Sequence, residues 1–171
     1  NIPSYTSVNN TSSGISGVIT VTPSANSCTG TSTSFTVLVN PIPNVNAIPS
    51  ATYCAGVTVP VTNLTGSVTS TSYNWTNSNS AIGLGTSGVG NISSYTSANV
   101  TSAGISGVVT VTPSANSCIG APINFTVLVN PIPTVNAIPS SSACSGGTVA
   151  AASFNGNVTG TNFSWSNSNS S

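Results

Sequence analysis

The side chains that could carry chemistry are few: four cysteines, four tyrosines, and no Lys, Arg, Asp, Glu or His in 171 residues. General acid–base catalysis needs a group that titrates near working pH, and only Cys, Tyr or a chain terminus could serve. The cysteines are candidates for disulfide bonds, because neither a CxxC spacing nor a His supports zinc. The sequence therefore predicts no catalysis, no cofactor and no metal ion. The four disulfide candidates are Cys28, Cys54, Cys118 and Cys144.

The absence of charge also excludes several classes of partner. A nucleic-acid binder needs Lys or Arg to displace phosphate counterions, and a calcium cage normally includes carboxylates. No apolar run approaches the roughly 20 residues that span a bilayer. We therefore expect no nucleic-acid partner and no membrane span in this segment.

Four aromatic residues form two pairs with the spacing of a β-strand. Tyr73 and Trp75 are two residues apart, as are Phe163 and Trp165. Each pair therefore points to one face of an extended segment. Such a pair could stack on a sugar ring, but we favour the interpretation that it fills the core of a sandwich.

The elements that position these residues are predicted to be strands. Ser, Thr and Asn make up nearly half of the chain, and there are 16 Gly and 11 Pro. Val, Thr and aromatic residues favour strands, whereas Gly, Pro and Asn favour turns. No segment has the spacing of an amphipathic helix. The predicted fold class is all-β.

The chain repeats itself with a period of 90 residues. Residues 1–81 aligned with residues 91–171 give 52 identities in 81 positions, without a gap. A unit of 90 residues has the size of a sandwich domain and is longer than a solenoid repeat. We interpret the pattern as a recent duplication within a longer tandem array.

Alternation within one period predicts seven short strands. Seven strands with a Trp on the third are typical of an immunoglobulin-like sandwich. Pro60 indicates an edge or a bulge in the second strand, and loops are expected at 83–90 and 113–122. The seven predicted strands are 45–48, 58–62, 73–76, 81–84, 92–97, 107–112 and 124–129.

Proline pairs mark the expected inter-domain joints, which are Pro41 and Pro43 and their copies Pro131 and Pro133. Proline fixes φ, so such a joint is short and stiff. Residues 41–130 then form a complete domain. Residues 1–40 supply the last three strands of one repeat, and residues 131–171 supply the first three strands of the next.

The two partial domains together make one domain that lacks the counterparts of residues 82–90. We therefore expect either a window on a periodic polymer or neighbouring copies that complete each other by supplying strands.

One ordered run of residues covers 19–30, 35–41 and 54–56, then Tyr73-Asn74-Trp75 and residues 82–84. In this run the sequence resembles the PKD-like (polycystic-kidney-disease-like) tandem domains of large surface adhesins and secreted filament proteins from gliding, type IX-secreting bacteria. The resemblance implies tandem immunoglobulin-like sandwiches, an extracellular or cell-surface location, and a place in long adhesin-like or filamentous arrays. Many relatives carry an acidic turn that this chain lacks, which argues against a calcium-stiffened joint.

In an exported protein, an even number of cysteines indicates disulfides. Cys54 precedes the second predicted strand, and Cys118 lies in the last hairpin loop. With seven alternating strands these two turns lie at opposite ends of a domain, roughly 30 Å apart, which is too far for a bond. We therefore favour a staple from Cys54 to the copy of Cys118 one domain further on. A strand miscounted by one would restore a bond between Cys54 and Cys118.

Neutrality fits a material that assembles, because uncharged copies do not repel each other and their edge strands lack protective Lys residues. The favoured function is a structural stalk or extracellular filament that self-associates without catalysis. The alternative is a module that binds a glycan or a surface polymer through exposed aromatic, Asn, Ser and Thr side chains.

Overall fold

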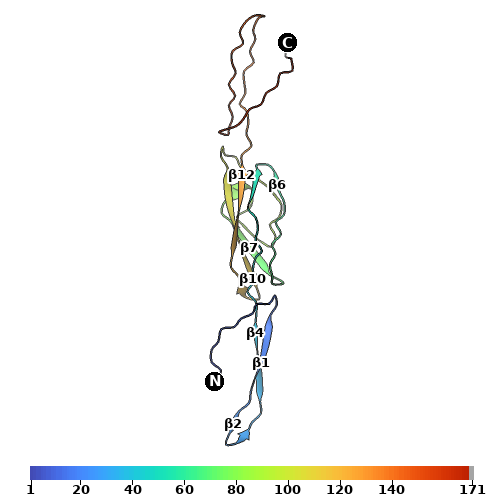
Figure 1. Ribbon diagram of the computed structural model, residues 1–171, viewed down its shortest axis with the longest axis vertical. Helices are drawn as coiled ribbons and strands as arrows, with labels where there is room; N and C mark the ends of the chain where they lie inside the picture. Colours follow the sequence, from blue (N-terminus) through green and yellow to red (C-terminus); the bar gives the residue numbers. More distant parts are fainter. Residues whose placement is uncertain (170–171) are drawn as a thin grey trace.

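The computed structural model describes residues 1–169, and within that range it is all-β with one short 3-10 helix, η1. Figure 1 shows a hairpin at one end of a long axis, a closed central unit, and the segment after β12 at the other end. In chain order the elements are β1 (Ile15–Val21), β2 (Ser24–Ala25), β3 (Cys28–Thr29), β4 (Thr33–Val39), β5 (Ala51–Cys54), β6 (Thr58–Val59), β7 (Ser72–Asn77), η1 (Ser80–Ile82), β8 (Ser87–Val89), β9 (Tyr95–Thr96), β10 (Ile105–Ala115), β11 (Cys118–Ile119) and β12 (Ile123–Asn130).

Residues 41–130 form a sandwich-like unit with two sheets. The larger sheet has the strand order β5-β12-β10-β7-β8, with β11 paired to β10, and the smaller sheet pairs β6 with β9. β5 runs parallel to β12, whereas the other pairs in the unit are antiparallel. The all-β prediction is confirmed for the described residues.

The core of this unit comes from alternate residues of the large sheet. Every second residue is buried in β7, in β10 from Gly107 onward, and in β12. Val109, Val111 and Val129 have no exposed surface, and Ile82 packs against them from η1. Each such side chain contributes roughly 1.5–3 kcal/mol through its removal from water.

Trp75 is fixed by its neighbours across the sheet. It pairs with Val111 on β10 and with Gly88 on β8. The indole ring lies over Gly88, where an added Cβ would overlap it. A glycine is therefore required opposite this tryptophan.

Several predicted strands adopt other conformations. Residues 45–48 form no strand, although the Asn46 amide donates to the Thr65 carbonyl at 2.8 Å. Residues 80–82 form η1 where a strand was predicted at 81–84, because the Asn79 side chain caps the turn by accepting from the Ala81 amide. The predicted loop 83–90 contains β8.

The second predicted strand is interrupted at Pro60, as the sequence indicated. β6 ends at Val59, and the ladder continues only as a single bridge between Thr62 and Ile92. Proline has no amide hydrogen to donate to the ladder.

Half of the predicted loop 113–122 is strand. β10 extends to Ala115 and pairs with β11, so only Asn116 and Ser117 form the turn, with φ of 48° and 65°. Two residues with positive φ make the turn that matches the twist of a hairpin.

The flanking segments repeat the sequence of the central unit but do not repeat its burial. β1 and β4 pair in the same register as β10 and β12, while residues 131–169 contain no strand. Trp165 is 75% exposed. The prediction that it lies in a core is therefore wrong for this structure, because the strands that bury Trp75 have no counterparts beside it. Phe163 is half-buried and packs against Phe154, with ring centroids 5.9 Å apart.

Gly88→Ala should destabilise the central unit by about 1–3 kcal/mol, because the new methyl group forces the Trp75 ring out of its position. The measurement is urea unfolding followed by far-UV circular dichroism. Gly85→Ala is the matched control, because an added Cβ there meets nothing within 4 Å. Equal unfolding midpoints for the two variants would contradict the proposed packing.

Candidate functional site

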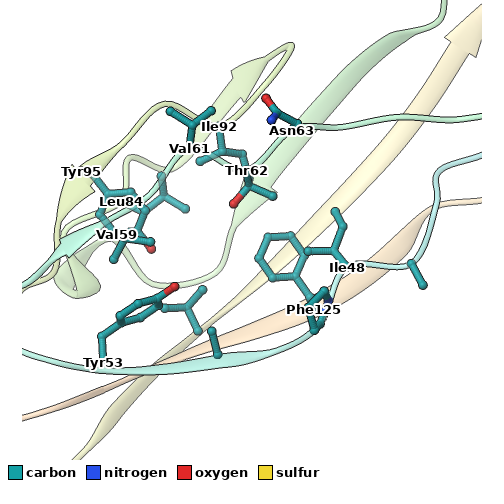
Figure 2. Close-up of a pocket in the computed structure, with 14 residues that line it drawn as sticks. Ile48, Tyr53, Val59, Val61, Thr62, Asn63, Leu84, Ile92, Tyr95 and Phe125 are labelled. Atoms are coloured by element: carbon teal, nitrogen blue, oxygen red, sulfur yellow. The ribbon is translucent and has the colours of Figure 1, made fainter.

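A cavity of about 330 Å³ opens between the two sheets of the central unit. Figure 2 shows Tyr53 and Phe125 on one wall, facing Val59, Leu84 and Ile92 on the other. Most of the lining residues are apolar, and the ionisable side chains among them are Tyr53 and Tyr95. The space therefore suits an apolar group and offers no constellation for acid–base chemistry.

The Tyr95 hydroxyl is the unsatisfied polar group at this cavity. It is buried and has no hydrogen-bond partner among the described residues. Burial raises the pKa of Tyr95 above its ordinary value of 10.0, and the neighbouring Tyr53 adds to the increase. Tyr95 therefore stays neutral at physiological pH, but its unpaired hydroxyl costs stability.

The aromatic residues of β7 do not form a sugar platform. Tyr73 and Trp75 are each only 8% exposed and belong to the hydrophobic core. A ring must present an open face to stack on a sugar, and these two rings are covered by protein.

The first proline joint is packed into the central unit. Pro41 and Pro43 are almost completely buried, together with Pro113 of β10. The Pro43 carbonyl lies so close to Gly120 that an added Cβ there would overlap it. The second joint is less completely packed, because Pro131 is buried but Pro133 is exposed. Close packing as well as fixed φ therefore stiffens the first joint.

Each end of the central unit lies beside the neighbouring segment. At one end, Asn40 donates its side-chain amide to the Asn116 carbonyl at the turn of the β10–β11 hairpin, 3.3 Å away. At the other end, a Cβ added to Gly56 would lie 3.8 Å from Ile132 Cδ1. A cavity of about 410 Å³ at that junction is lined by residues of both segments, including Gly104 and Val158.

All four cysteines are free thiols, and three of them are exposed, with Cys118 half-buried. Cys54 lies opposite Asn130, the last residue of β12. Cys118 lies on β11, beyond the end of β12 that is opposite to Asn130. The eight residues of β12 separate the two thiols by roughly 25 Å. The alternative disulfide between Cys54 and Cys118 within one unit is therefore wrong.

The β1–β4 hairpin has one apolar side that we call the hairpin face. Val21 and Phe35 are 44% and 47% exposed, whereas their sequence counterparts Val111 and Phe125 are 0% and 7% exposed. In the central unit this surface is packed against Ile82, Leu84 and Ile92 of the opposite layer, and β7 extends the sheet beside β10. Beside the hairpin face the described residues place Tyr5, and β1 pairs only with β4. The hairpin face consists of Ile19, Val21, Phe35, Val37 and Val39.

Sequence reasoning did not identify the contacts between segments. The Asn40–Asn116 contact joins residues 76 positions apart, and both are ordinary members of an Asn-rich chain. Recurrence at the repeat distance gives no signal for the contact either, because most positions of the chain recur in this way.

The chain matches no protein-family model, and no curated protein is significantly similar to it. Within residues 1–169, no helix is long and apolar enough to cross a membrane.

Tyr95→Phe should stabilise the central unit by about 1 kcal/mol at neutral pH, because it removes a buried hydroxyl that has no partner. It should also reduce the loss of stability at high pH. Since the pKa of Tyr95 is raised in the folded state, its neutral form supports folding fully below pH 10 and loses that effect as pH rises through the folded pKa.

The measurement is the urea midpoint at pH 7 and at about pH 11, in a reducing buffer. Tyr5→Phe is the matched control, because Tyr5 is the sequence counterpart of Tyr95 and is 61% exposed. Destabilisation by Tyr95→Phe at pH 7 would show that the hydroxyl has a favourable partner.

Proposed function

We propose that this chain is a structural repeat segment of an extracellular bacterial filament or adhesin stalk. Its tandem immunoglobulin-like, PKD-like sandwiches, with a period of 90 residues, supply length and self-association without catalysis. The observation that carries the proposal is the end-to-end arrangement in Figure 1, with a hydrogen bond at one end of the central unit and a cavity shared with the neighbouring segment at the other.

The topology of the central unit supports an immunoglobulin-like assignment. The first strand, β5, pairs in parallel with the last strand, β12, in a sheet ordered β5-β12-β10-β7-β8. This sheet faces a second sheet that contains β6 and β9. The core Trp75 on β7 occupies the place of the tryptophan on the third strand of such sandwiches.

The joints support a role in transmitting mechanical force along the chain. Buried prolines and the close approach of Pro43 to Gly120 leave the first joint little freedom to bend. A chain of stiffly joined units transmits force along its axis, as a stalk or a filament requires.

Electron microscopy of the native material tests this function. Ordered fibres or straight stalks should show an axial spacing of about 35–45 Å per 90-residue unit, because the strands of such a sandwich run along the fibre axis. Dispersed, freely bending strands that bind a glycan with the exposed Trp165 would contradict the proposal and favour the adhesin-tip alternative.

Association should be almost independent of salt and of pH between about 4 and 8, because no side chain titrates there and no charge pair exists to be screened. Sedimentation from about 20 mM to about 1 M NaCl should change the apparent association constant by no more than about twofold. A weakening of tenfold or more below 0.5 M would contradict association through neutral contacts.

A further inference from the structure

We propose that the cavity between the two sheets of the central unit binds a small, uncharged organic molecule, an apolar ring system that carries one carbonyl group. The carbonyl oxygen accepts a hydrogen bond from the Tyr95 hydroxyl, and the rings fill the apolar interior. This binding goes beyond the proposed structural function, which needs no ligand.

The cavity is formed entirely within the central unit. Its lining comes from residues 47–127, and the strands of that unit pair with one another. β5 belongs to the larger sheet and β6 to the smaller one, so no ladder of hydrogen bonds closes the two layers where β5 and β6 line the cavity. The opening is therefore a property of this unit and not of the segments that flank it.

The size of the cavity suits a molecule of about two rings. Its volume of about 330 Å³ lies in the range of small-molecule sites. An apolar cavity of about 150 Å³ is already large enough for benzene. The buried part of the lining is aliphatic or aromatic and consists of Val59, Leu84, Ile92, Phe125 and Val127.

The Tyr95 hydroxyl determines which polar group the ligand carries. It is buried and has no hydrogen-bond partner among the described residues. Figure 2 shows Tyr53 and Tyr95 at one end of the cavity and Asn63 at the other. A phenol donates a hydrogen bond more readily than it accepts one, because the lone pairs of its oxygen are partly delocalised into the ring. An acceptor oxygen on the ligand therefore pairs with Tyr95 best and removes the cost of the unpaired hydroxyl.

The ligand must also be uncharged. The chain has no Lys, Arg, His, Asp or Glu, so a carboxylate or an ammonium group in the cavity would lose its hydration without gaining an ion pair. Burial raises the pKa of Tyr95, so the phenol keeps the proton that it donates.

The two repeats agree on the interior of this cavity and differ at its mouth. Tyr95 recurs as Tyr5, and the buried Val59, Ile92, Phe125 and Val127 also have identical counterparts one period away. The lining positions that differ are all exposed or half-buried. At these positions Ala51, Tyr53, Val61, Thr62 and Asn63 correspond to Ser141, Ala143, Ala151, Ala152 and Ser153. A constant interior with a variable mouth is typical of sites that bind different ligand shapes on one scaffold.

The experiment compares two test ligands that differ only at the polar group. 2-Acetylnaphthalene carries a carbonyl group, and 2-ethylnaphthalene has a methylene group in its place. Equilibrium dialysis against the 171-residue chain in a reducing buffer measures the dissociation constant of each. We expect 2-acetylnaphthalene to bind with a dissociation constant on the order of 100 µM or tighter, within the range that small ligands reach per atom.

Tyr95→Phe tests the hydrogen bond. The variant should bind 2-acetylnaphthalene about fivefold or more weakly, because one hydrogen bond is lost. Its affinity for 2-ethylnaphthalene should be unchanged, since that molecule makes no such bond. Tyr5→Phe is the matched control and should bind both molecules like the unmodified chain. Because Tyr95→Phe is expected to stabilise the empty unit, weaker binding cannot be attributed to a loss of folding.

Ala51→Leu tests the place of binding. Ala51 and Tyr53 lie on the same side of β5, since side chains alternate along a strand, and both line the cavity. The larger side chain should fill the space and weaken the binding of both naphthalenes roughly tenfold or more. Ala121→Leu is the control, because Ala121 is exposed and does not line the cavity. Urea midpoints of the two variants show whether each one folds.

Three results would overturn the proposal. The first is no binding of 2-acetylnaphthalene up to its solubility limit. The second is an equal effect of Tyr95→Phe on both naphthalenes, which would show that the hydroxyl does not contact the carbonyl group. The third is undiminished binding to a folded Ala51→Leu chain, which would place the ligand on another surface, such as the hairpin face. None of these results bears on whether the native material forms fibres or stalks.

Discussion

The pairing of β7 with β10 is the interaction on which the rest of this structure depends. Where β10 has β7 beside it, Val111 is completely buried and Trp75 lies in the core. Where the sequence counterparts of these strands lie at opposite ends of the molecule, Val21 and Trp165 remain exposed. The same side chains are therefore core or surface according to whether these strands pair and Ile82, Leu84 and Ile92 pack over them. Local sequence does not decide between the two outcomes.

A neutral chain must satisfy its buried polar groups without ion pairs. Here amides and hydroxyls supply the hydrogen bonds, and the Tyr95 hydroxyl and the Trp75 indole N–H are left without a partner among the described residues. Asn99 donates to the Ala103 and Val129 carbonyls, and its counterpart Asn9 makes the equivalent bonds to Ser13 and Val39. Ser97 donates to the Cys54 and Val57 carbonyls and is 1% exposed. Short side chains cost little conformational entropy when fixed in this way, and their hydrogen bonds are insensitive to salt and to moderate pH. The resulting structure is held together by contacts that a changing medium leaves intact.

Strand alternation allowed the sequence to predict β7, β10 and β12 and the core position of Trp75, because period-two burial is a local signal. The two-residue turn at Asn116 and the capped η1 were missed, because Asn and Ser are so common here that turn residues carry little information. The exposure of Trp165 could not be predicted from its own segment either, since burial there depends on strands far away in the chain. The opposite placement of Cys54 and Cys118 agrees with the sequence argument. The strand count behind that argument was wrong in detail, because β5 and β8 replace the strands predicted at 45–48 and 81–84.

Assembly of identical neutral units poses a problem of specificity, because charge cannot select one register over another. An unprotected apolar hairpin could pair with any extended segment, and slipping by one residue would turn its apolar side toward solvent. Shape can supply the selection instead. Gly88 admits the Trp75 ring and Gly120 admits the Pro43 carbonyl, so a slipped register would place side chains where only hydrogen fits. A chain without a single charged side chain can therefore still assemble in one register, provided that its glycines and large residues recur at a fixed period.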